Sequence, residues 1–227
     1  MADRKAVNPF HFVGCLELRE MLGRRAADAQ QLLAVIEEAP LDSIYYHTHS
    51  YFLRHEYAQT LFPSDFAMWA AASLRDRVLS ERLGLIDPFG FRDLESLRLA
   101  IATTIDEHLK TLWNVPRLIQ GDPFEFIRSH IIEVDLELMA GGLQAFRDQL
   151  ATVDRSALFN HICEAKIRKG RRSNDFVAWI GSDAGLNLPA LAQRVAAIQP
   201  VGLSLEGIRS RTLAVLDGWL HASATAA

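Results

Sequence analysis

Apolar residues recur every three or four positions along most of the chain, which is the period of an amphipathic helix. The clearest stripe follows Asp93, a residue type that caps helices, and consists of Leu94, Leu97, Ile101, Ile105 and Leu109. A similar stripe follows Ser204 and consists of Leu205, Ile208, Leu216 and Leu220. Both patterns predict a helix that buries one face.

Two segments instead alternate between apolar and polar residues, as a half-buried strand does. They are FHFVGCLEL at 10–18 and HIIEVDLEL at 130–138. Both are short, and helical periodicity dominates elsewhere. The predicted fold is therefore all-α or mainly α, with or without a short two-stranded pairing of these two segments.

Several landmarks occur twice and in the same order, which is the sign of an internal repeat. The matched pairs are NPFHF at 8–12 with DPFEF at 122–126, IYYH at 44–47 with LFNH at 158–161, and SDFAMW at 64–69 with NDFVAW at 174–179. We predict a tandem duplication, with helical lobes at 8–113 and 122–221 and a linker at 114–121 that contains proline. Ser64 and Asn174 are the predicted N-caps of matching helices.

Composition narrows the class of protein. With 49% hydrophobic and 23% charged residues in a chain of 227, the protein has the make-up of a globular domain. A net charge of −4 provides no positive field for nucleic acid. We see no apolar run of membrane-spanning length and no secretory signal pattern, so a cytoplasmic protein without membrane contact is expected.

One constellation of polar and aromatic residues recurs in both predicted lobes. A histidine and an arginine seven residues apart share one helix face, and an Asp-Phe-x2-Trp run follows. An arginine fork with a histidine suits a carboxylate or phosphate, and the tryptophan suits stacking. The candidate ligand-binding residues are Tyr46, His47, Arg54, Asp65 and Trp69, with His161, Arg168, Asp175 and Trp179.

The same residues also have a purely structural interpretation. An arginine beside an aspartate at a helix start is a common ion pair between helices, and Phe and Trp three apart are usually core. The predicted lobes differ, since Tyr46 of the first aligns with Asn160 and His49 with Cys163. If one lobe alone binds a ligand, we expect it to be the first.

A metal site is the sharper alternative for the histidines. His47, His49, His161 and Cys163 form two equally spaced pairs that would hold zinc or iron if both segments were strands. A helix would instead separate residues i and i+2 by about 200°, so a helical stretch argues against a cofactor. We interpret the remaining histidines as surface or capping residues: His11, His55, His108, His130 and His221.

The run from FHFVGCLELREMLGRRA through SIYYHTH to SDFAMW resembles a bacterial and archaeal family classified as a domain of unknown function. The likeness is best over 8–110, and the second half is similar to a diverged copy. Relatives occur with sugar-nucleotide glycosyltransferases, so the resemblance implies a carbohydrate context without an established activity.

The sequence contains neither a phosphate-cradling loop nor a nucleophile elbow. The leading hypothesis is a non-catalytic accessory or regulatory module that binds a partner protein or a small polar or anionic ligand. The first alternative is a metal-assisted enzyme acting on a phosphorylated or sugar substrate. The second is a structural homodimer that buries Tyr45, Tyr51 or Phe52 against a second copy.

Overall fold

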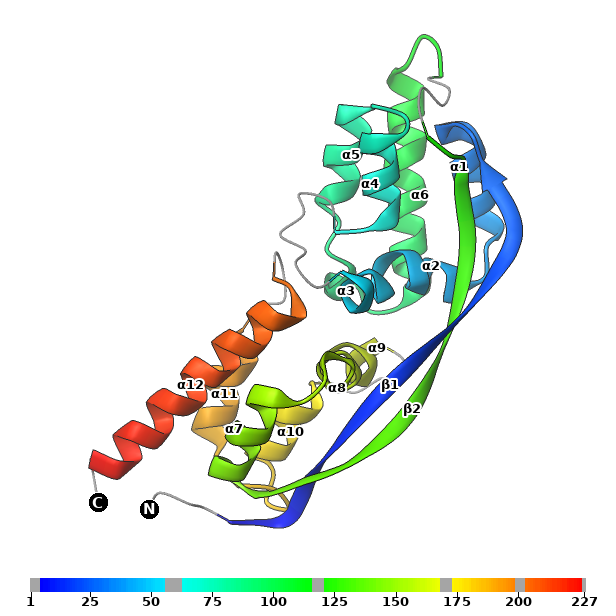
Figure 1. Cartoon of the computed structure of the whole chain (residues 1–227). Helices are drawn as coiled ribbons and strands as arrows, with labels where there is room; N and C mark the ends of the chain where they lie inside the picture. The colour runs from blue at the N-terminus through cyan, green and yellow to red at the C-terminus, as the bar shows by residue number, and fades with distance from the viewer. Residues whose placement is uncertain (1–4, 56–62, 116–120, 168–172, 199–202, 226–227) are drawn as a thin grey trace. The chain divides into compact units, whose positions relative to one another are not determined.

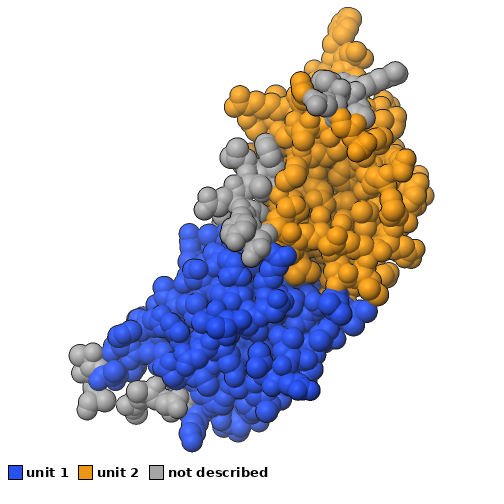
Figure 2. All heavy atoms as spheres, in the orientation of Figure 1, with its two compact units in different colours: residues 1–16, 132–227 blue, residues 17–131 orange. Residues whose placement is uncertain are grey.

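The computed structural model describes residues 5–55, 63–115, 121–167, 173–198 and 203–225. The chain forms two compact units, which Figure 2 colours separately. Unit 1 contains residues 1–16 and 132–227, and unit 2 contains residues 17–131. Two long strands, β1 (Lys5–Ala26) and β2 (Phe124–Gly142), pair in one sheet, and each passes from one unit into the other (Figure 1).

Side-chain pairs show that the two strands run antiparallel. In unit 2, Arg25 of β1 lies 2.6 Å from Glu125 of β2, whereas Glu20 lies 2.7 Å from Arg128. Positions that rise along one strand therefore fall along the other, as an antiparallel ladder requires.

The prediction of an all-α or mainly α fold is wrong, because β1 has 22 residues and β2 has 19. The protein is a mixed fold in which helices predominate. Most positions of β1 beyond its aromatic start are exposed or partly exposed. A ribbon with so few buried positions lacks the apolar alternation by which strands are recognised. The two alternating segments do pair, but they are only parts of much longer strands.

In unit 2, helices pack against the end of β1 and the start of β2. They are α1 (Ala29–Glu38), α2 (Leu41–Thr48), α3 (Ser50–Arg54), α4 (Asp65–Ala72), α5 (Arg77–Gly84), the 3-10 turn η1 (Pro88–Gly90) and α6 (Leu94–Thr111). The predicted caps are present, since the side chains of Ser64 and Asp93 accept from the backbone N–H of Ala67 and Ser96.

In unit 1, the helices follow the end of β2. They are α7 (Leu143–Thr152), α8 (Arg155–Phe159), the π-helix η2 (Asn160–Glu164), α9 (Ala165–Ile167), α10 (Asp175–Gly181), α11 (Pro189–Ala196) and α12 (Leu205–Thr225). Asn174 caps α10 by accepting from the N–H of Val177, and Ser204 accepts from the N–H of Gly207, as predicted.

Each unit takes its aromatic strand from the other half of the sequence. Phe124 of β2 stacks on Phe66 of α4, with ring centroids 5.1 Å apart, in the core of unit 2. Phe12 of β1 stacks on Phe146 of α7 at 5.5 Å in unit 1. Burying a phenylalanine side chain contributes about 1.5–3 kcal/mol, so these strand segments are integral to the cores they enter.

The tandem duplication and the lobe boundaries at 8–113 and 122–221 stay predictions. The predicted lobes are consecutive stretches of the sequence, whereas the boundary between the compact units crosses both strands. Within the described ranges, no helix combines the length and apolar character needed to span a membrane.

Candidate ligand-binding pocket

In unit 2, the imidazole of His47 joins a helix to a strand. Nδ1 lies 2.8 Å from a carboxylate oxygen of Asp65, the first residue of α4. Nε2 lies 3.1 Å from the backbone nitrogen of Ile127 in β2. Trp69, one turn further along α4, donates its indole N–H to the carbonyl of Asp122 at 3.1 Å. These bonds fix the entry of β2 on the helices.

In unit 1, His161 makes the same set of bonds. Its Nδ1 lies 2.9 Å from Asp175, and its Nε2 lies 2.9 Å from the backbone nitrogen of Val13 in β1. Trp179 donates to the carbonyl of Asn8 at 2.8 Å. In both units, the bound N–H lies five residues after the bound carbonyl, from Asp122 to Ile127 and from Asn8 to Val13. We call each set of bonds a histidine clamp.

The clamps determine the state of both imidazoles. A backbone N–H is always a donor, so Nε2 must accept and Nδ1 carries the proton that is donated to aspartate. Burial lowers the pKa of His47, and this outweighs the hydrogen bond to Asp65, which raises it. With both ring nitrogens engaged, neither histidine is positioned as a catalytic base or metal ligand.

In unit 2, Arg54 and Arg19 make further contacts around the clamp. Arg54 donates to Asp65 at 2.7 Å and to the carbonyl of Tyr46 at 2.8 Å. Its guanidinium carbon lies 4.1 Å from the centre of the Tyr46 ring, and Arg19 approaches that ring at 5.8 Å. Burial raises the pKa of Asp65, but the hydrogen bonds from His47 and Arg54 hold it below its ordinary value. Of the predicted ligand-binding residues of the first lobe, Tyr46, His47, Arg54 and Asp65 thus lie together and contact one another.

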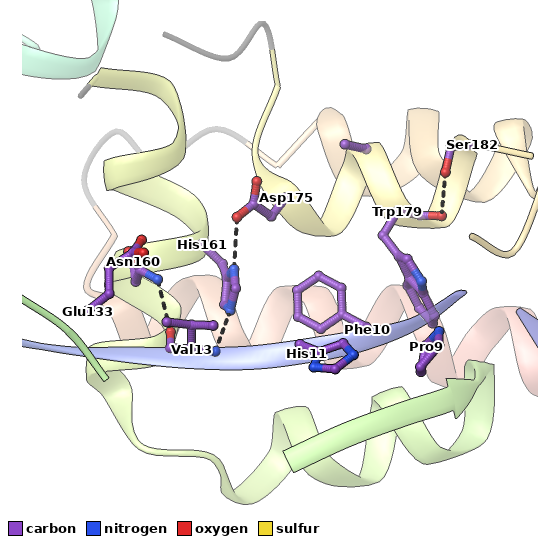
Figure 3. Close-up of a pocket in the computed structure, with 11 residues that line it drawn as sticks. Pro9, Phe10, His11, Val13, Glu133, Asn160, His161, Asp175, Trp179 and Ser182 are labelled. Carbon is purple, nitrogen blue, oxygen red and sulfur yellow. Dashed lines mark hydrogen bonds and ion pairs between the residues drawn. The ribbon is translucent and has the colours of Figure 1, made fainter. Parts of the chain in front are cut away.

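In unit 1, a pocket of about 500 Å³ opens beside the clamp (Figure 3). Asn160 stands immediately before His161, where Tyr46 stands before His47. Its amide donates to the carbonyl of Val13 at 3.1 Å. The lining joins β1, β2, η2 and α10 and consists of Pro9, Phe10, His11, Val13, Glu133, Asn160, His161, Asp175, Ala178, Trp179 and Ser182. This volume lies within the range of small-molecule sites, about 300–1,000 Å³.

The helix that carries Asn160 and His161 is distorted. Residues Asn160–Glu164 form a π-helix between α8 and α9, whereas His47 lies in the regular helix α2. Inserted π-helical turns occur frequently at functional sites because they re-aim side chains. Gly185 follows α10, and a Cβ there would overlap the carbonyl of Trp179. The π-helix supplies Asn160 and His161 to the wall of the pocket, and Gly185 allows the chain to pass close to Trp179.

The other metal candidates point elsewhere. The stretch 43–54 is helical, and His49 donates from Nε2 to the carbonyl of Pro88 at 3.1 Å. Burial lowers the pKa of His49 to about 3. Cys163 is 1% exposed and lies in unit 1, whereas His47 and His49 lie in unit 2. The described residues contain no group of three or more His, Cys, Asp or Glu side chains arranged to hold a metal.

Several other predicted residues are placed differently from expectation. Tyr45, Tyr51 and Phe52 are buried within the chain at 0%, 0% and 7% exposure, so they do not offer a surface to a second copy. His108 is neither a surface nor a capping residue, because it is buried and lies 2.6 Å from Asp76. Arg168 lies outside the described residues.

Sequence reasoning missed the strand half of the site. Phe10, Val13 and Glu133 line the pocket, but the sequence indicates only that they belong to predicted strands or to the repeated Pro-Phe-x-Phe pattern. The recurrence of Pro-Phe-x-Phe in NPFHF and DPFEF was a usable signal, because the same aromatic pair enters each clamp. No sequence signal showed which helices each strand would join.

Comparison with known proteins agrees with the resemblance. Residues 7–217 match a family of unknown function, DUF5752. The chain belongs to this family. The structure of OrfY from Thermoproteus tenax aligns with a TM-score of 0.75 and 24% identity, over 94% of this chain and 96% of that one. At this identity the likeness shows a shared fold alone. No curated protein matches the chain.

Proposed function

We propose that this member of the DUF5752 family is a non-catalytic accessory or regulatory protein that binds a small polar ligand in the pocket of unit 1. The observation that carries the proposal is the difference between the clamps. The ring of Tyr46 packs beside His47, whereas an open space of about 500 Å³ lies beside His161.

The walls combine aromatic surface with polar groups, as small-molecule sites do. Phe10 and Trp179 lie with ring centroids 5.4 Å apart, and Asn160, His11 and Ser182 supply polar atoms. The indole orientation is fixed by its bond to Asn8. A rigid aromatic wall lowers the entropy lost on binding.

A binding role fits the chemistry better than catalysis. The imidazole of His161 is held between Asp175 and the N–H of Val13, so it offers no free nitrogen to a substrate. A carbohydrate context for the ligand rests on the family resemblance and is tested with the probes below.

The test is an NMR titration of the Trp179 indole N–H, assigned with Trp179→Phe. The probes are glucose, glucose 1-phosphate, ADP and tyrosine. We expect at least one to shift the Trp179 signal saturably in wild-type protein. Asn160→Tyr introduces into unit 1 the residue that unit 2 already has, and it should abolish the shift. If none of the four shifts the signal, or if Asn160→Tyr binds as wild type does, the proposed site is wrong.

A further inference from the structure

The helices of each unit hold a strand through its backbone. In unit 1, Trp179 binds a carbonyl of β1, and His161 binds the N–H five residues further on. In unit 2, Trp69 and His47 bind the carbonyl and the N–H of β2 at the same spacing. Main-chain bonds of this kind give affinity for an added strand, and side-chain pockets give the specificity.

The side-chain contacts that select the strand also match in the two units. The rings of Phe10 and Phe12 in β1 have centroids 4.9 Å apart and planes at 71°. Those of Phe124 and Phe126 in β2 show 4.9 Å and 70°. The first ring of each pair lies beside the clamped imidazole, at 4.8 Å in unit 1 and 4.6 Å in unit 2. All four rings are buried. The flanking residues differ, NPFHFV against DPFEFI, so the helices recognise the pattern Pro-Phe-x-Phe.

The two units differ in how the recognised strand is connected to the helices. In unit 2, strand and helices belong to one stretch, 17–131. In unit 1, the recognised strand lies within 1–16 and the helices begin at Leu143, so all of unit 2 intervenes along the chain. The clamp bonds do not depend on this connection, because they join side chains to backbone atoms of the strand. Exchange of an identical element between copies is a low-cost route to dimers, since the same contacts form within or between molecules.

Beyond its clamped start, β1 is only lightly packed. Leu16, Leu18 and Met21 are 60%, 55% and 62% exposed. A change in the course of the strand here would disturb little packing, whereas the buried aromatic pair and the bound backbone groups would move together as one piece. The start of β1 is therefore a self-contained element that the helices of unit 1 can take from another molecule.

We propose that the helices of unit 1 are a receptor for a Pro-Phe-x-Phe strand, which takes β1 from its own chain or from a second copy in a strand-exchanged dimer. This exchange is independent of the small ligand under the proposed function. In the dimer, each copy supplies Pro9, Phe10 and Val13 to the pocket of the other, so the pocket has walls from two chains. A strand of the same chain is present at high effective concentration, so the dimer forms where the protein is concentrated or the chain's own strand is defective.

The test is complementation between two full chains, each unable to complete unit 1 with its own residues. The donor-defective chain, Phe10→Ala/Phe12→Ala, lacks the recognised pair, and the receptor-defective chain, His161→Ala/Trp179→Phe, lacks the clamp. The donor-defective chain alone is isotope-labelled, so the Trp179 indole N–H signal reports a strand bound in its receptor. Light scattering gives the mass. The matched control is a receptor-defective chain that also carries Phe10→Ala/Phe12→Ala.

By itself, the donor-defective chain should lose the wild-type position of the Trp179 signal, because the Asn8 carbonyl is no longer held against the indole. Addition of the receptor-defective chain should return the signal to that position saturably and double the mass, and the control chain should do neither. Absence of restoration, or equal restoration by the control, would overturn the inference. A Trp179 signal that stays in place in the donor-defective chain alone would also overturn it.

The Trp69 signal shows whether unit 2 stays folded, because its indole N–H is bound to the Asp122 carbonyl. If the alanine pair also displaces the Trp69 signal, Phe10→Leu/Phe12→Leu takes its place, since leucine removes the rings but keeps apolar bulk. The same outcomes then support or overturn the inference. No small ligand is added, so failure of complementation leaves the proposed function to its own test.

Discussion

The clamps of units 1 and 2 are built from the same bonds, yet their surroundings differ. Around His47, the helix is regular and the ring of Tyr46 is buried. Around His161, the helix is a π-helix and the equivalent of Tyr46 is Asn160, with a pocket alongside. The shared bonds indicate a structural role, and the differences locate the candidate function. The sequence favours the first lobe, which is richer in Tyr and His, and this preference stays a prediction; our proposal instead rests on the pocket of unit 1.

The largest effect should come from removing either histidine. His47→Ala and His161→Ala each remove the imidazole that joins an aspartate to a strand N–H, and each creates a cavity. We expect each to cost about 3–4 kcal/mol of unfolding free energy. Chemical denaturation followed by both far-UV circular dichroism and NMR measures the loss and shows which unit unfolds.

His11→Ala is the matched control, because His11 is exposed, and it should change stability by less than about 0.5 kcal/mol. If His161→Ala were as stable as wild type while His47→Ala unfolded, the clamps would not be equivalent. His161 would then not be needed for stability, and the non-catalytic proposal would lose its main support.

Exchanging the residues before the histidines should give unequal results. Tyr46→Asn removes a buried ring and its contact with Arg54, so we expect a loss of about 3 kcal/mol. Asn160→Tyr removes the amide that donates to the Val13 carbonyl, but its ring can occupy part of the pocket that Asn160 lines, so we expect a smaller loss, within about 1 kcal/mol. Thermal and urea unfolding of both variants measures the asymmetry. Equal losses would mean that Asn160 is as tightly packed as Tyr46 and that the pocket is not preformed.

Acid should weaken unit 2 through its buried histidines. The folded-state pKa of His49 is lowered to about 3 by burial, and that of His47 is lowered too. Below the unfolded pKa of about 6.5 the unfolded chain takes up protons that the folded chain does not, so stability falls as pH falls. For His49 alone, the loss between neutral pH and pH 5 is about 2 kcal/mol.

The measurement is the urea midpoint from pH 7.5 to 4.5 in wild type and His49→Gln. His49→Gln removes one titrating group, and its stability should depend less steeply on pH by about 1.4 kcal/mol per unit below pH 6.5. Asp65 also makes the protein less stable as pH falls, but only below about pH 4, because its folded-state pKa lies below the ordinary value for aspartate. Parallel pH profiles for the two proteins would show that His49 is not buried as a neutral group.

Helices and caps could be predicted from the sequence, because stripes such as that after Asp93 and residues such as Ser64 carry local signals. The full strands could not, since β1 is largely exposed and has no alternating pattern beyond its aromatic start. The placement of each strand on its helices depends on contacts between residues far apart in the sequence, 148 positions for Val13 with His161 and 80 for Ile127 with His47. The pocket is lined by residues of β1, β2, η2 and α10 that are far apart in the sequence, and local patterns do not show which of them will meet.

The smallest effect concerns the caps that begin α4 and α10. Ser64 accepts from Ala67 at 3.2 Å, and Asn174 accepts from Val177 at 2.9 Å, so each satisfies one N–H at a helix start. Ser64→Ala and Asn174→Ala should each cost about 1 kcal/mol, while Ser64→Asn and Asn174→Ser should be nearly neutral. Denaturation midpoints of the four variants test this. A loss above about 3 kcal/mol in Asn174→Ala alone would mean that the cap also positions Asp175 for His161, and the clamp of unit 1 would then depend on a residue outside its own bonds.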